Sequence, residues 1–204
     1  PPLVLVASPC LAHPAIAATP TAATEGAAVL KTEMALRDLW VEHVFWIRSY
    51  VLATHAGDAA QSKVAEAEVV ANAKALASTI RPFYGQSASD VLFNLLAGHW
   101  AAVRDYSTAV VSHSKPGQDK AKQDITANAH EIARFLSGAN PHLPEEAVFG
   151  LFAAHGAHHV AQSNQVAAKD FRGEALTWHA MRKHMLTISD SIAGALAKQF
   201  PEKF

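Results

Sequence analysis

The chain has 204 residues, of which half are apolar and 17% are charged, so a large hydrophobic core in a single domain is available. Its 17 Lys and Arg residues nearly balance 18 Asp and Glu, and no basic run stands out, which argues against a nucleic-acid partner. Ala is abundant, alternating β-branched residues are scarce, and Gly and Pro stand mostly at junctions, so the composition predicts an all-α protein.

Residues 1–31 are expected to form a leader outside the folded domain, which we expect to span residues 32–204. The apolar run Pro2–Ala7 precedes an Ala-rich stretch, and Ala15-Ile16-Ala17 has the small-x-small pattern of a cleavage site. We therefore expect a signal-peptide remnant and an exported protein, periplasmic or secreted; the alternative is a disordered Ala/Pro/Thr leader. Cys10, the only cysteine, lies here, so a processed chain has no disulfide. No later stretch is apolar for long enough to span a membrane.

From Thr32 onward, apolar residues recur every three or four positions, which is typical of amphipathic helices. The segment 81–85 should end the second helix because Pro82 disfavours helix at the residue before it. A capping box at Ser87–Asp90 then opens the third helix, and Pro144 with two acidic residues opens the fifth. The expected helices are about 32–56, 64–80, 87–111, a fourth between 117 and 138, 144–168, and 174–199.

A repeat of 56 residues runs through these helices. His43, His99 and His155 are separated by this interval, and an ungapped overlay at the same offset matches many other positions. The aligned sets include Leu39/Leu95/Leu151, Trp40/Leu96/Phe152, Asn72/Asn128/His184, Leu76/Ile132/Ile188 and Gly117/Gly173. The repeat predicts three helical hairpins, 33–88, 89–144 and 145–200.

Three hairpins can close into a six-helix bundle or stack as an open solenoid. In the closed, pseudo-threefold bundle the three first helices run parallel around an axis, so that equivalent histidines converge. In a solenoid they form a row, and the outer two are too far apart to share an ion. Solenoids usually have more repeats and polar caps, so we favour the closed bundle.

Three converging imidazoles predict a metal site at His43, His99 and His155. Nitrogen ligands suit Zn, Cu or Fe, and three of them leave a fourth position open for water or substrate. His159 is one helical turn from His155, a spacing used in zinc-binding helices, and is a further candidate ligand. We expect Asn72, Asn128 and His184, on the partner helices, to orient the ligand rings through their second nitrogens. His158 is expected to be exposed.

Two other interpretations stay open. The histidines could be structural core residues that set helix register in a non-enzymatic envelope or binding module. An apolar helical bundle could also hold a non-covalent haem or another small molecule. The sequence shows no phosphate loop, nucleophile elbow, Asp-x-Asp motif or paired Glu-x-x-His motif, so no catalytic residue is assigned and enzymatic activity is undecided.

Several motifs resemble a family of small bacterial helical proteins whose members often carry the name glycosyltransferase or acetylglucosaminyltransferase. The motifs are Leu39-Trp40 with His43 and Trp46, Asn128-Ala129 with Glu131-Ile132-Ala133, Phe135-Leu136-Ser137, Asn140-Pro141, and Gln199-Phe200-Pro201 with Lys203-Phe204. The resemblance covers about residues 36–204. It implies a helical fold and the placement of the three histidines, and it brings no established mechanism.

Overall fold

The computed structural model describes residues 22–204, and this part of the chain is all-helical without a strand, as predicted. It contains six α-helices and one short 3-10 helix: α1 (Ala22–Ala56), α2 (Ala59–Ser78), α3 (Arg81–Val111), α4 (Lys115–Ala139), α5 (Glu145–Ala167), α6 (Phe171–Gln199) and η1 (Pro201–Lys203). None of these helices is long and apolar enough to cross a membrane. The expected cleavage pattern lies outside the described residues.

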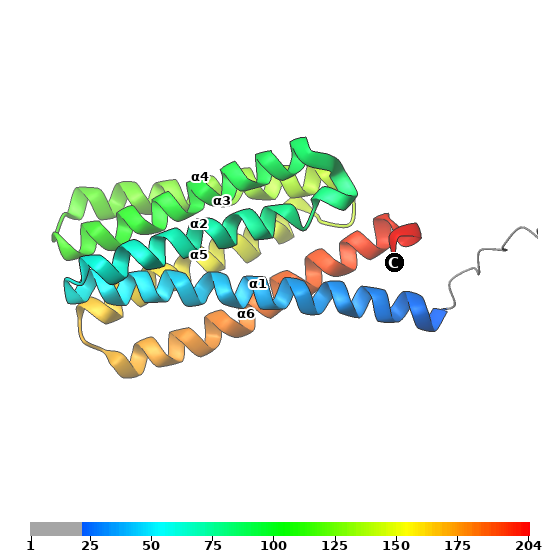
Figure 1. The fold of residues 1–204 in the computed structure, drawn as a ribbon. Coiled ribbons are helices and arrows are strands. Elements are labelled where there is room, and N and C mark those ends of the chain that lie inside the picture. Colours follow the sequence, from blue (N-terminus) through cyan, green and yellow to red (C-terminus); the bar gives the residue numbers. More distant parts are fainter. Residues whose placement is uncertain (1–21) are drawn as a thin grey trace, which may run out of the picture.

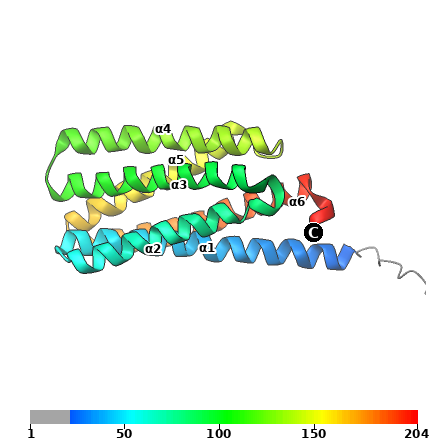
Figure 2. The ribbon, with the colours of Figure 1, turned by 45° about the horizontal axis from the view of Figure 1, so that its top comes forward.

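The helices lie side by side along one long direction (Figures 1 and 2). Helices α1, α3 and α5 run one way, and α2, α4 and α6 run the other way (Figure 1). Each helix contacts the next one in the chain, and α6 also contacts α1. In addition, α1, α3 and α5 contact one another, which makes them the inner helices of the bundle.

The three turns after α1, α3 and α5 repeat the same local design. In each turn, a residue with positive φ ends the inner helix and the next residue caps the following helix. The positive-φ residues are Gly57 (75°), His113 (54°) and Lys169 (57°). The capping side chains of Asp58, Ser114 and Asp170 each accept a hydrogen bond from the backbone N–H three residues later. These positions are separated by the 56-residue repeat, so the repeat extends to the turn chemistry.

Two boundaries differ from expectation. Helix α1 begins at Ala22, so residues 22–31, assigned above to a disordered leader, are helical. Pro82 does not break a helix but stands in the first turn of α3, where its missing N–H costs nothing; the kink falls at Gly85, with φ 84° and ψ 177°. The capping box expected after it is replaced by a bond from the Ser89 hydroxyl to the Ala77 carbonyl, which ties α3 to α2.

The core consists of two apolar clusters that follow each other along the bundle. The first includes Leu36, Trp40 and Phe152, and the second includes Ile47 and Val103. On each inner helix, the repeat histidine stands where the first cluster gives way to the second. The repeat histidines therefore lie between the two apolar clusters.

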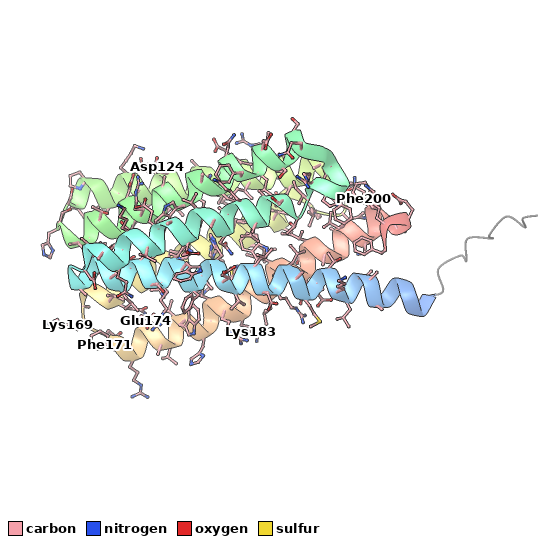
Figure 3. All side chains as sticks on the ribbon, in the orientation of Figure 1. Asp124, Lys169, Phe171, Glu174, Lys183 and Phe200 are labelled. Carbon is pink, nitrogen blue, oxygen red and sulfur yellow. The ribbon has the colours of Figure 1, made fainter. Side chains whose placement is uncertain are left out.

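The seam between α1 and α6 joins the first and last helices through two bidentate ion pairs. Arg48 donates to both carboxylate oxygens of Glu174 at 2.6 and 2.8 Å, and Arg37 donates to both oxygens of Asp190 at 2.6 and 2.7 Å. Glu174 is only 3% exposed and also accepts from the Gln162 amide at 2.9 Å, so it links α1, α5 and α6. Figure 3 labels Glu174 near the start of α6. Hydrogen bonding from Arg48 lowers the pKa of Glu174 despite its burial.

We expect Glu174→Gln to lower the free energy of unfolding by roughly 2 kcal/mol at pH 7, less than for a fully buried pair because Arg48 is partly exposed. The folded-state pKa of Glu174 is depressed, so its contribution is present above the unfolded pKa and disappears as the pH falls through the folded one. Urea unfolding at pH 7 and in acid measures both effects. Glu131→Gln, at an exposed position of α4, is the control and should change little.

Close packing of α5 on α4 requires Gly156, the residue after His155. A Cβ there would lie 2.4 Å from Cγ2 of Ile125, whereas a Cβ at Gly150, on the same helix, would have no neighbour within 4 Å. We expect Gly156→Ala to destabilise the fold by about 1–3 kcal/mol through overpacking. Gly150→Ala should instead stabilise it by up to about 1 kcal/mol because Ala favours helix. Equal effects of the two substitutions in urea unfolding would contradict this packing argument.

Candidate metal centre

Four histidines from the three inner helices meet in the middle of the bundle. His43 lies on α1, His99 on α3, and His155 and His159 on α5; each is no more than 2% exposed. One ring nitrogen or the other of each histidine can be chosen so that all four lie within 4.8 Å of one another. The structure thus brings together all four residues that the sequence proposed as ligands.

The four imidazole rings lie against one another. The centroids of His43, His99 and His155 are 5.1–6.2 Å apart, and the His159 ring is 4.3 Å from that of His155. The Nε2 atoms of His155 and His159 are 3.1 Å apart and form the only hydrogen bond found for any of the four rings among the described residues. The other six ring nitrogens are buried without a partner.

Burial keeps these imidazoles neutral. It lowers the pKa of His43 to about 3 and that of His99 to about 4, and repulsion from a charged His99 lowers the pKa of His43 further. Burial also lowers the pKa of His155 and His159 well below the ordinary value, with added repulsion from the neighbouring rings. A neutral imidazole has one free lone pair, so the cluster offers ligand atoms that do not first have to lose a proton.

The residues predicted to orient the ligands occupy equivalent positions behind them. Asn72 donates to the Leu39 carbonyl at 3.0 Å, Asn128 to the Leu95 carbonyl at 2.9 Å, and His184 Nε2 lies 2.8 Å from the Leu151 carbonyl. Each carbonyl belongs to the residue four positions before a site histidine, so it also accepts that histidine's backbone N–H in the helix. These bonds set the height of each inner helix against its partner.

The amide oxygens of Asn72 and Asn128 are possible hydrogen-bond acceptors for the rings of His43 and His99. Oδ1 of Asn72 and Oδ1 of Asn128 are buried and unpaired. Each asparagine side chain partly opposes the lowering of the pKa of its histidine, Asn72 for His43 and Asn128 for His99. An imidazole N–H that points away from an ion could therefore donate to this oxygen.

A buried polar layer next to the cluster was missed by sequence reasoning. The side chains of Ser107, Gln162 and Ser163 are fully buried, and each has an oxygen without a partner. Ser163 follows His159 by one helical turn, so the polar layer adjoins the fourth histidine. Gln162 stands where the other two repeats have Tyr50 and Tyr106. This departure from the repeat is the one feature of the sequence that could have indicated the polar layer.

His158 was expected to be exposed, but it is half-buried. Its ring centroid lies 5.5 Å from that of His184. Three other histidines among the described residues take no part in the cluster. His130 stacks on Phe149 with the centroids 3.7 Å apart, His113 forms part of the α3–α4 turn, and His179 is exposed on α6.

Comparison of the chain with protein-family models, with curated proteins and with solved structures gave no match. Four nitrogens bound to a tetrahedral ion at about 2.0–2.1 Å lie about 3.3 Å from one another. The four ligand atoms are already within 4.8 Å, so ring rotations and shifts of about 1 Å would bring them to that spacing.

The lowered pKa values make the metal-free protein sensitive to mild acid. A histidine whose folded pKa is below its unfolded value destabilises the fold once the pH falls below the unfolded pKa, near 6.5. His43 and His99 alone should cost about 4 kcal/mol between pH 7 and pH 5. Chemical unfolding of the metal-free protein across this range measures the loss. This window lies above the pH at which Glu174 is protonated, which separates the two effects.

The variant that tests this pH dependence is His99→Leu. It removes one buried titrating group and places an apolar side chain at the same buried position. We expect it to flatten the pH dependence by about 2 kcal/mol over the same interval. His179→Ala, at an exposed position, should leave the slope unchanged. A metal-free protein equally stable at pH 7 and pH 5 would show that the four rings are not held neutral by burial.

Proposed function

We propose that this protein binds one transition-metal ion through His43, His99, His155 and His159. The observation that supports the proposal most strongly is the set of six buried ring nitrogens that have no hydrogen-bond partner. A buried unpaired polar atom costs about 1–3 kcal/mol, so a fold that gathers six of them carries a large penalty. An ion that takes one lone pair from each ring offsets that penalty.

The proposed arrangement has three repeat hairpins, 33–88, 89–144 and 145–200, closed around a pseudo-threefold axis. It is supported by the mutual contacts of α1, α3 and α5, by the contact of α6 with α1, and by hydrogen bonds that recur at the repeat interval. His43, His99 and His155 then form a tripod around the axis. His159, one turn further along α5, supplies a fourth nitrogen, which replaces the open position expected from three ligands alone.

The donor set favours Zn, Cu or Fe, because imidazole suits these ions better than Mg or Ca, which require oxygen. No carboxylate or thiolate belongs to the cluster found among the described residues, so the ligands do not neutralise the ion's charge. The Asn72 and Asn128 oxygens would accept the outer N–H groups of His43 and His99 and so spread that charge. A tetrahedral ion with four protein ligands has no site for water, so we propose binding rather than hydrolysis.

The competing interpretations fit the contacts less well. Structural histidines normally have hydrogen-bond partners, yet six ring nitrogens of this cluster have none. A haem would need a flat space between axial ligands, whereas these rings pack directly on one another.

Export to the periplasm or outside the cell is a further part of the proposal; it is supported only by the sequence of the first 20 or so residues.

We expect the metal-free protein to take up one equivalent of Zn²⁺, Cu²⁺ or Fe²⁺, measured by elemental analysis after gel filtration. X-ray absorption should show nitrogen neighbours only, at about 2.0–2.1 Å for zinc. Saturation should raise the free energy of unfolding by about 3–4 kcal/mol at 100–1,000 times the dissociation constant.

The variants separate loss of the site from loss of the fold. His99→Leu should keep the helical circular-dichroism spectrum and lose the stoichiometric ion, because a leucine packs well in the core but donates no lone pair. His179→Ala should bind like wild type. Full binding by a folded His99→Leu protein, or no uptake of any of the three ions by wild type, would refute the tetrahistidine site.

A further inference from the structure

The four proposed ligands are almost completely buried, so an ion needs a route to them through the surrounding helices. On two sides the outer helices cover the site with side chains that are themselves buried: Asn72 on α2 is 4% exposed and Asn128 on α4 is 7% exposed. On the third side, α6 carries the partly exposed His184 at the equivalent position. Figure 3 labels Lys183, the residue before His184, and so shows where this position lies on α6.

The third repeat departs from the other two at both positions that face each other here. The residue three places after the site histidine is Trp46, Ala102 or His158, and its counterpart on the outer helix is Asn72, Asn128 or His184. Only the third repeat therefore has two imidazoles at this point. Their ring centroids are 5.5 Å apart with the planes at 62°, and both residues are half-buried between α5 and α6.

The tautomer of the neutral His184 ring leaves one nitrogen free for a ligand. Its Nε2 lies 2.8 Å from the Leu151 carbonyl, which can only accept, so Nε2 carries the hydrogen. In the neutral ring, Nδ1 then has the lone pair. His158 has a buried Nδ1 without any hydrogen-bond partner.

We infer that His158 and His184 form an outer metal-binding site through which the ion reaches and leaves the buried histidines. The inference rests on the proposed function. Two protein nitrogens with water in the other positions hold an ion less tightly than four nitrogens do, so the outer site exchanges its ion readily. His155 precedes His158 by three residues on the same helix, so the two side chains lie on one face of α5. The ion can therefore exchange water and outer ligands for inner ones without a change of oxidation state.

The test uses a double variant that gives the third repeat the residues of the second, His158→Ala with His184→Asn. Asparagine at 184 can keep the bond to the Leu151 carbonyl, as Asn72 and Asn128 do in their repeats, so the fold is preserved while both outer ligands are removed. Stopped-flow absorption with Co²⁺, whose visible bands report nitrogen coordination, follows loading of the metal-free full chain. Transfer of Co²⁺ to EDTA follows its loss.

Wild type should load one tight equivalent and bind a second weakly, whereas the double variant should keep the tight equivalent and lose the weak one. Loading and loss should both slow by about tenfold in the double variant. His179→Ala should behave like wild type. Unchanged rates in the double variant, or a second weak equivalent that persists in it, overturn the outer site while leaving the buried one in place. Absence of any Co²⁺ band in wild type overturns both proposals.

Discussion

The burial of four imidazoles between the two apolar clusters of the core is the constraint on which the rest of this structure depends. Each ring separates two hydrophobic clusters, and none finds a hydrogen-bond partner outside the group. The fold holds the rings neutral by desolvation and accepts the cost of six unpaired nitrogens. Under the proposed function this cost has a use, because an ion that binds to neutral, preplaced rings has neither protons to displace nor long side chains to order.

The surrounding structure keeps the rings in that position. Asn72, Asn128 and His184 each reach across to a carbonyl one helical turn before a site histidine, so sliding of any inner helix past its partner would break a buried bond. The seam between α1 and α6, which no loop connects, is held by the Arg48–Glu174 and Arg37–Asp190 pairs. Together these contacts bring ring nitrogens of residues more than a hundred positions apart within 4.8 Å of one another.

The parts of this arrangement that could be predicted are those that the repeat copies. The spacing of His43, His99 and His155 and the alignment of Asn72 with Asn128 and His184 were visible because each position has counterparts at a fixed interval. The convergence of the rings was expected only because a closed bundle was favoured over a solenoid. The repeat itself does not decide whether the last helix packs against the first. Glu174, which makes that contact, aligns with Gln118 and Ser62 and so left no repeated pattern. The early start of α1 was hidden by an Ala-rich stretch that suits both a leader and a helix.

The third repeat concentrates the departures from the pattern, and these departures are chemically related. His159 replaces the aliphatic residues of the other repeats, and His158, Gln162, Glu174 and His184 likewise have no identical counterpart. Three of the five are imidazoles at or beside the buried cluster, and two others form the hydrogen-bonded pair that joins α5 to α6. A symmetric tripod needs only one histidine per repeat. In the proposed site, a fourth nitrogen and an outer pair on the same flank make the arrangement asymmetric, which is what a buried site needs if its ion is to enter and leave from one side.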